Sequence, residues 1–198
     1  MSARSDILDA IRAQRVRSTA RPAQYQPSPL HGDLIETFTR RASAVDTEVR
    51  ILNSAAEIPA AVADLLRAKN MAAEIHVAPG ASAPDMPSLT VTHALPGPDD
   101  AALTAAPFAI AETGTLAYTA AEPNPASWHF RAGFEIAVLR AADILPHMEN
   151  VLARIKAKGA LPHTINFVTG PSRTGDIEQT LELGAHGPKA LAILIIRE

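Results

Sequence analysis

The sequence lacks cysteine altogether and has few aromatic side chains, five Phe, two Tyr and one Trp in 198 residues. Without thiols this chain can form no disulfide and can hold no iron–sulfur cluster through cysteine ligands. The aromatic residues are too few for a platform that stacks successive bases of a single strand, and the net charge of −3 is not that of a basic nucleic-acid binder. We therefore expect no nucleic-acid partner.

Long apolar runs are also absent. No stretch approaches the roughly 18 apolar residues of a membrane span, and charged residues interrupt the N-terminal segment, unlike the apolar core of a secretory signal. With 47% hydrophobic and 20% charged residues, the composition is typical of a globular protein. We expect a cytoplasmic protein without a membrane span.

The first thirty residues differ in charge from the rest. They contain five arginines and two aspartates, a net charge of +3, which leaves −6 for the remainder. Apolar residues at helical spacing predict a helix over residues 5–16, and three prolines between residues 22 and 29 predict a linker. We expect residues 1–30 to form a helical arm with a linker, which could bind an acidic partner or RNA but more simply packs on its own domain.

Beyond residue 30, helix and strand patterns alternate. The sequence predicts helices over residues 33–45, 54–69, 99–103, 143–158 and 175–183. It predicts strands over residues 48–52, 74–77, 89–92, 107–111, 115–119, 134–139, 164–169 and 191–196. Strands separated by helices indicate a mostly parallel sheet flanked by helices. We therefore predict one α/β domain over residues 31–198, with strands 134–139, 164–169 and 191–196 in the same sheet.

The segment that follows strand 164–169 offers groups that bind anions. Gly170, Ser172, Arg173 and Thr174 supply backbone N–H groups, hydroxyls and a guanidinium before a predicted helix. Gly170 and Gly175 have the spacing of a phosphate loop, but the Lys-Ser/Thr pair that must follow is missing, which excludes a nucleoside triphosphatase. A structural interpretation stays open, in which Thr174 caps the helix and Arg173 pairs with a nearby carboxylate.

A second polar turn joins the strands 107–111 and 115–119. It places the carboxylate of Glu112 beside the hydroxyls of Thr113 and Thr115, and Gly114 permits a positive φ or a close approach. Glu112 could act as nucleophile, base or ligand anchor. Alternatively it is a solvated residue of a hairpin.

The seven histidines have no spacing typical of metal ligands, so we expect no metal site. His186 follows the helix-ending Gly184 and could fold back beside the last strand, or it could be a backbone-bonded turn residue. No Gly-x-Ser-x-Gly frame of an α/β-hydrolase is present.

Three segments, read together and in order, resemble a known family. They are Ala-Glu-Thr-Gly-Thr at 111–115, Gly-Pro-Ser-Arg-Thr-Gly-Asp-Ile-Glu at 170–178 and Gly-Ala-His-Gly-Pro at 184–188. They are similar to the lactate-utilisation protein C family of LUD-domain proteins. The resemblance implies a fold similar to sugar-phosphate isomerases and CoA-transferases. It also implies a role in oxidising L-lactate to pyruvate with iron–sulfur oxidoreductase partners.

Two functions follow as expectations. One is an accessory subunit of a lactate-utilisation system, whose polar loops hold a small carboxylate or phosphate or dock a partner. The other is a stand-alone enzyme of CoA-transferase or sugar-phosphate type, with Glu112 as nucleophile or base and residues 170–175 as the anion site. In either case we predict that Glu112, Thr113, Ser172, Arg173 and Thr174 converge on one pocket at the carboxyl edge of the sheet. The sequence identifies no cofactor.

Overall fold

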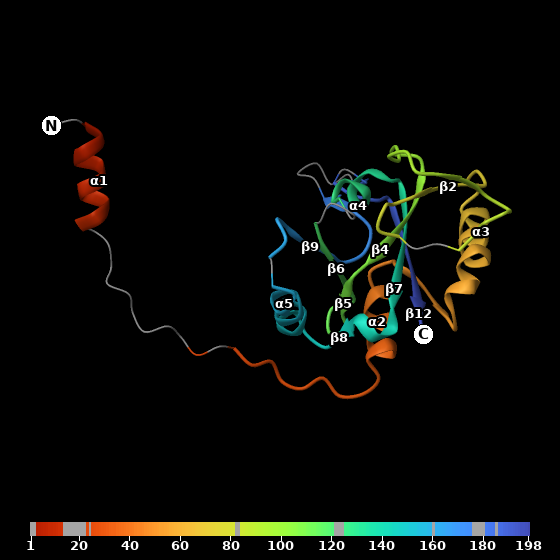
Figure 1. The fold of residues 1–198 in the computed structure, drawn as a ribbon, viewed down its shortest axis with the longest axis horizontal. Coiled ribbons are helices and arrows are strands. Elements are labelled where there is room, and N and C mark those ends of the chain that lie inside the picture. The colour runs from red at the N-terminus through yellow and green to blue at the C-terminus, as the bar shows by residue number, and fades with distance from the viewer. Residues whose placement is uncertain are drawn as a thin grey trace.

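A computed structural model describes residues 3–13, 23, 25–81, 84–120, 125–159, 161–175, 181–184 and 186–198. Within these residues the chain forms a parallel sheet of six strands, a second sheet of four strands and a two-stranded hairpin. Helices flank the large sheet (Figure 1). The predicted α/β class with a mostly parallel sheet is confirmed.

The large sheet is parallel throughout. Its strands, in spatial order, are β1 (Glu48–Leu52), β12 (Ala190–Ile196), β7 (Phe134–Arg140), β4 (Ala101–Ala106), β2 (Glu74–Val77) and β3 (Thr90–Thr92). The apolar run of β12 is explained by its central place. Leu194 faces one buried core and Ile193 the other, because alternate residues of a strand point to opposite faces.

Two helices cover opposite faces of this sheet. The first, α2 (Leu34–Ser43), begins where the Asp33 carboxylate accepts the N–H of Ile35 at 2.7 Å, and it buries Phe38 in the core on its face. The second, α3 (Ile58–Ala68), follows a short 3-10 helix, η1 (Ala55–Glu57), and packs on the other core. Hydrophobic burial from both sides therefore holds the sheet.

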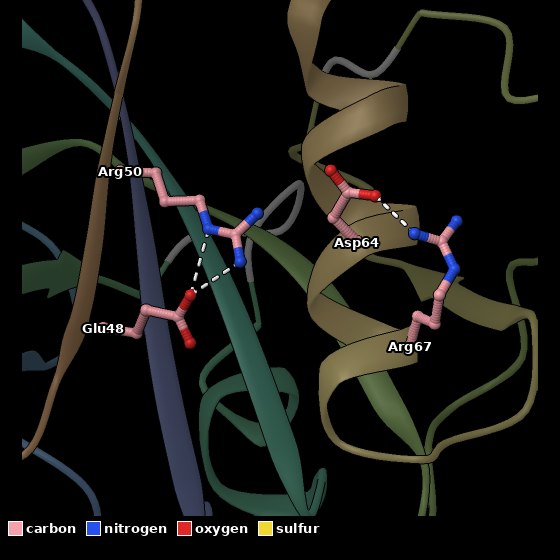
Figure 2. A network of polar contacts seen from close by, with 4 residues as sticks. All are labelled: Glu48, Arg50, Asp64 and Arg67. Carbon is pink, nitrogen blue, oxygen red and sulfur yellow. Dashed lines mark hydrogen bonds and ion pairs between the residues drawn. The ribbon is translucent and has the colours of Figure 1, made fainter.

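Figure 2 shows two ion pairs on the outside of this layer. Arg50 bonds Glu48 within β1, and Arg67 bonds Asp64 within α3. Each pair lies within one element and is partly or largely exposed. Such pairs contribute at most about 1 kcal/mol to the free energy of unfolding, so they do not hold the layers of the fold together.

The second sheet is mixed. Its strands, in spatial order, are β8 (Ile144–Leu145), β5 (Phe108–Ile110), β6 (Thr115–Thr119) and β9 (Ile165–Val168). Strand β6 is antiparallel to both of its neighbours, and α5 (Met148–Ala157) packs on this sheet through Val151 and Ile155. The prediction that strand 164–169 shares a sheet with strands 134–139 and 191–196 is therefore wrong. The strand β9 is only partly buried and lies at the edge of the smaller sheet.

Three predicted helices are also wrong in whole or in part. The helix predicted over residues 99–103 is wrong, because residues 101–106 form the strand β4, which pairs with β7 and β2. In place of a helix over 175–183, β10 (Arg173–Gly175) pairs antiparallel with β11 (Leu181–Leu183), and residues 176–180 lie outside the described residues. Thr174 therefore lies in a strand and caps no helix there.

The helix predicted from residue 143 begins later. A 3-10 turn, η2 (Ala141–Asp143), and the short strand β8 precede α5, which starts at Met148. The patterns also missed α4 (Ser127–Arg131). Near the N-terminus, α1 (Ala3–Ala13) buries none of its residues and stands apart from the sheets in Figure 1. No helix among the described residues has the length and apolar character needed to cross a bilayer.

Candidate functional site

Glu112 lies in the turn between β5 and β6 and is held against the start of α5. Its backbone N–H donates to the carbonyl of Pro146 at 3.1 Å. Its carboxylate Oε2 accepts a hydrogen bond from Nδ1 of His147 at 2.8 Å. The Glu112 side chain is 50% exposed, whereas that of His147 is 7% exposed. The turn thus joins a half-exposed carboxylate to a buried imidazole.

This pair has the chemistry of an oriented base. Because a carboxylate can only accept, this contact places a proton on Nδ1 of His147. Nε2 of His147 is buried and has no hydrogen-bond partner in the described part of the chain. The sequence analysis singled out Glu112 but not His147. The one local feature that could have identified His147 is its position directly before the first turn of α5.

The hydroxyls of the same turn meet the end of β9. Thr115 Oγ1 lies 2.7 Å from Thr113 Oγ1 and 2.7 Å from Thr169 Oγ1. The strands β5 and β9 both run antiparallel to β6. Their ends therefore meet where β6 begins, which brings the two predicted polar segments into contact.

Two glycines allow these segments to pack against the end of α2 and the residues that follow it. At Gly114, with φ +69°, an added Cβ would lie 2.4 Å from the backbone nitrogen of Ala42. At Gly170, with φ +77°, it would lie 2.6 Å from the carbonyl oxygen of Val45. Both positions require glycine for conformation and for space.

Ser172, Arg173 and His186 form a separate group of contacts. The Ser172 N–H donates to the carbonyl of Pro188 at 2.8 Å, and the backbone N–H of His186 donates to Ser172 Oγ at 3.3 Å. Arg173 pairs with Asp46, and both side chains are at least half exposed. His186 is thus bonded through its backbone, as in the turn interpretation, and Arg173 has the carboxylate partner of the structural alternative.

The Ser172 segment does not lie at the predicted carboxyl edge of the parallel sheet. Glu112 pairs with His147 and Arg173 pairs with Asp46. Ser172 bonds Pro188 just before β12 begins, which is the amino end of that strand. The prediction assumed that a strand of the parallel sheet precedes each polar segment. Both segments instead follow strands of the mixed sheet. The side chain of Thr174 lies outside the described residues.

A second polar cluster, which the sequence analysis missed, lies between the two sheets. Oε1 of Glu135 accepts hydrogen bonds from Thr104 Oγ1 at 2.6 Å, from Tyr118 OH at 3.0 Å and from His129 Nδ1 at 2.8 Å. All four residues are buried. The imidazole of His129 stacks on the ring of Tyr118 with 3.6 Å between ring centroids. We call these four residues the Glu135 cluster.

The Glu135 cluster joins β4, β6, β7 and α4. Burial, followed by the charge of Glu135, raises the pKa of Tyr118 well above its usual 10.0, so the phenol stays protonated and donates. A carboxylate without solvent needs donors, and here all three converge on Oε1, whereas Oε2 is buried and has no hydrogen-bond partner among the described residues. The one sequence signal was a charged residue inside the apolar strand Phe-Glu-Ile-Ala-Val-Leu.

No group of three or more histidine or acidic side chains among the described residues is arranged to hold a metal ion. The two carboxylate–imidazole contacts, Glu112 with His147 and Glu135 with His129, are instead hydrogen-bonded pairs. They differ in access, because only the first has a carboxylate open to solvent.

Comparison with known proteins identifies the domain. The family model described as LUD domain matches residues 99–196. Lactate utilization protein C of Geobacillus kaustophilus is 32% identical over 93 residues, which are 45% of this chain and 39% of that protein. The protein of the same name from Halalkalibacterium halodurans is 30% identical over 103 residues, 50% of this chain and 45% of its own length. The chain thus spans less than half the length of these relatives.

A solved structure supports the fold. The crystal structure of a DUF162 family protein from Deinococcus radiodurans matches with a TM-score of 0.63, covering 85% of this chain and 99% of the other at 22% identity. The match with the LUD family model includes the Glu112 turn, the Glu135 cluster and the Ser172 segment. The family predicted from the sequence is confirmed for residues 99–196, which match the LUD domain, and the relatives named Lactate utilization protein C support it at modest identity.

Proposed function

We propose that this protein takes part in lactate utilisation, as an accessory subunit that works with iron–sulfur oxidoreductase partners in oxidising L-lactate to pyruvate. The observation that carries the proposal is the similarity of the chain to proteins named Lactate utilization protein C. The composition supports a division of labour. A chain without cysteine must leave electron transfer through thiolate-bound clusters to other subunits.

Deletion of the coding sequence in its native host tests this role. We expect the deletion strain to lose growth on L-lactate and to keep normal growth on glucose. Affinity purification of the tagged protein from lactate-grown cells should recover iron–sulfur proteins, and the purified chain alone should not reduce dyes with lactate. Unchanged growth of the deletion strain on lactate would contradict the proposal.

The exposed segment at Ser172 and Arg173 is proposed as a site for a small carboxylate or phosphate. Its support is a half-exposed guanidinium beside a serine whose hydroxyl is only partly engaged. Asp46 already pairs with Arg173, so an anion must compete with it. Since the pair is exposed, its loss costs at most about 1 kcal/mol of stability.

Calorimetric titration with inorganic phosphate tests this site. Arg173→Ala should abolish phosphate binding while the melting temperature changes little. Arg67→Ala, which removes a similarly exposed pair with Asp64, should leave phosphate binding unchanged. A destabilisation of several kcal/mol by Arg173→Ala, with binding intact, would instead favour the structural interpretation.

A stand-alone enzyme of CoA-transferase or sugar-phosphate type is the second candidate. The observation that favours it is the half-exposed carboxylate of Glu112 beside the His147 imidazole. A carboxylate in such a position can attack an acyl thioester, which expels CoA thiolate and forms a mixed anhydride. The thiolate then attacks the glutamyl carbonyl, which gives a glutamyl–CoA thioester and releases the acyl group as a free carboxylate. Intact-protein mass spectrometry after incubation with acetyl-CoA should then detect that adduct, and Glu112→Gln should abolish it. Absence of any adduct in the wild type would reject the nucleophile role.

A further inference from the structure

Strand β9 has a free edge on the side away from β6. It pairs with β6 alone among the described strands, and in Figure 1 it lies at one side of the folded domain, beyond β6. The N–H of Ala120 donates to the carbonyl of Thr164 at 3.0 Å, so residues 164, 166 and 168 are the ones that bond to β6. In an antiparallel ladder the residues between them point the other way. The backbone N–H and C=O groups of Ile165 and Phe167 therefore face outward, without a strand partner among the described residues.

This edge lacks the features that normally keep two strand edges from pairing. Proteins protect an exposed edge with charged residues, with proline or with very short strands. Among the other edge strands of the two larger sheets, β1 carries Glu48 and Arg50, β3 has three residues and β8 has two. The sequence of β9, Ile-Asn-Phe-Val, holds no charge and no proline, and Phe167 is 39% exposed. The free edge of β9 is thus open to pairing with another strand.

The side chains of β9 alternate between the two faces of its sheet. Phe167 pairs with Ala117, which packs in the core beneath α5, and Ile165 packs against the same core. Asn166 points to the opposite face, where its amide donates to Oγ1 of Thr164 at 3.4 Å. Around Asn166 the strand is therefore apolar, polar and apolar in both directions.

We propose that β9 pairs antiparallel with β9 of a second copy of this chain and forms a two-fold symmetric dimer. Asn166 lies on the two-fold axis opposite its own copy, and Ile165 lies opposite Phe167 of the second copy. Each of these two facing pairs exchanges two N–H···O=C bonds, so four backbone hydrogen bonds join the chains. The two sheets of four strands become one continuous sheet.

A second copy suits this edge better than an unrelated strand does. Two-fold pairing brings identical surfaces together, so a charge beside the axis would face its own like, and β9 carries none. The amide of Asn166 is both donor and acceptor, so it can bond to its own copy across the axis. Phe167 of each chain lies beside Ile165 of the other, and such aromatic and β-branched pairs stabilise antiparallel strands. Because pairing uses the free edge of both copies, association closes at the dimer.

Sedimentation of the full chain tests the association. We expect a monomer–dimer equilibrium that depends on concentration, with no larger species. Phe167→Lys places a charge on the pairing edge of each copy and should weaken the dimer at least about tenfold. The melting temperature should change little, because this side chain is exposed. Val91→Lys is the matched control, since Val91 is 42% exposed on the edge strand β3, and it should dimerise as the wild type does.

A thiol at the axis tests the register. The chain has no cysteine, so Asn166→Cys carries a single thiol. Opposite residues at such a position have Cα atoms about 4.5 Å apart, which a disulfide can span, so mild oxidation should give a covalent dimer. Thr164→Cys, on the same strand and the same face, is the matched control. In this register the two copies of residue 164 are more than about 13 Å apart, too far for a disulfide.

Three outcomes would overturn the inference. A wild-type chain that stays monomeric at about 100 μM rejects the second copy, also where the edge then binds a strand of another protein. A dimer that Val91→Lys weakens as much as Phe167→Lys does is joined through another surface. Equal cross-linking of Thr164→Cys and Asn166→Cys contradicts the register. None of these outcomes bears on the role in lactate utilisation, which growth of the deletion strain tests separately.

Discussion

Replacing Glu135 by leucine should destabilise the protein strongly, because the Glu135 cluster loses its common acceptor. Three donors, Thr104 OH, Tyr118 OH and the Nδ1–H of His129, converge on Oε1 of Glu135. Leucine has a similar volume but offers no acceptor, and each buried donor left unpaired costs about 1 to 3 kcal/mol.

The net cost is smaller than the sum of these terms. Removing a buried carboxylate also removes its desolvation penalty, and apolar replacements of buried charges can recover about 1 to 4 kcal/mol. We therefore expect a loss of about 3 to 5 kcal/mol in the free energy of unfolding. In a domain of this size that lowers the melting temperature by roughly 6 to 20 °C.

Denaturant unfolding followed by tryptophan fluorescence measures this loss. The sole tryptophan, Trp128, is buried in α4 next to His129, so its emission reports the element that the cluster holds in place. Glu48→Leu is the matched control, since it removes a partly exposed strand glutamate and should change stability by no more than about 1 kcal/mol. Equal effects of the two substitutions, or a gain in stability for Glu135→Leu, would refute the role given to the cluster.

Three further predictions concern stability. The pKa of Tyr118 is raised in the folded state. The stabilisation that the protonated phenol contributes is therefore fully present below pH 10 and is lost as the pH rises toward the folded-state pKa. Tyr118→Phe should reduce this alkaline loss of stability in pH-dependent melting curves. Gly114→Ala should cost about 2 to 4 kcal/mol in urea unfolding, because its Cβ meets backbone. Gly159→Ala, with positive φ but open space, should cost about 1 to 2 kcal/mol, and equal losses would contradict the packing argument. Asp33→Ala should cost about 1 kcal/mol by the same assay, and no change would mean that the N-cap of α2 adds nothing.

Local features of the fold could be predicted wherever the neighbouring sequence decides them. The Asp33 carboxylate caps α2 as its place before an apolar helical stripe indicates. Glu57 reaches back to the N–H of Ser54 at 3.3 Å, as its spacing of three residues predicts. The continuous apolar run at 191–196 lies at the centre of the parallel sheet. In each case the interacting groups are within a few residues of one another.

Predictions failed where distant segments decide the structure. Residues 99–103 are predicted to be helical, but residues 101–106 pair with β7 and β2 and form a central strand. Thr174 has the chemistry of a helix cap, yet its backbone pairs with Glu182 in a hairpin. Tertiary hydrogen bonds outweigh intrinsic propensities, which differ by less than about 1 kcal/mol per residue.

In the candidate site, too, the sequence determined some features and the tertiary structure determined the others. The sequence by itself determined the chemical identity of the groups at the β5–β6 turn, a carboxylate, two hydroxyls and a glycine able to adopt positive φ. Only the tertiary structure decided their partners. His147 joins Glu112 from 35 residues away, and Glu135 gathers donors from 31, 17 and 6 residues away. Local propensity acts over a few residues, whereas the approach of two strands and a helix depends on how the whole chain buries its apolar surface.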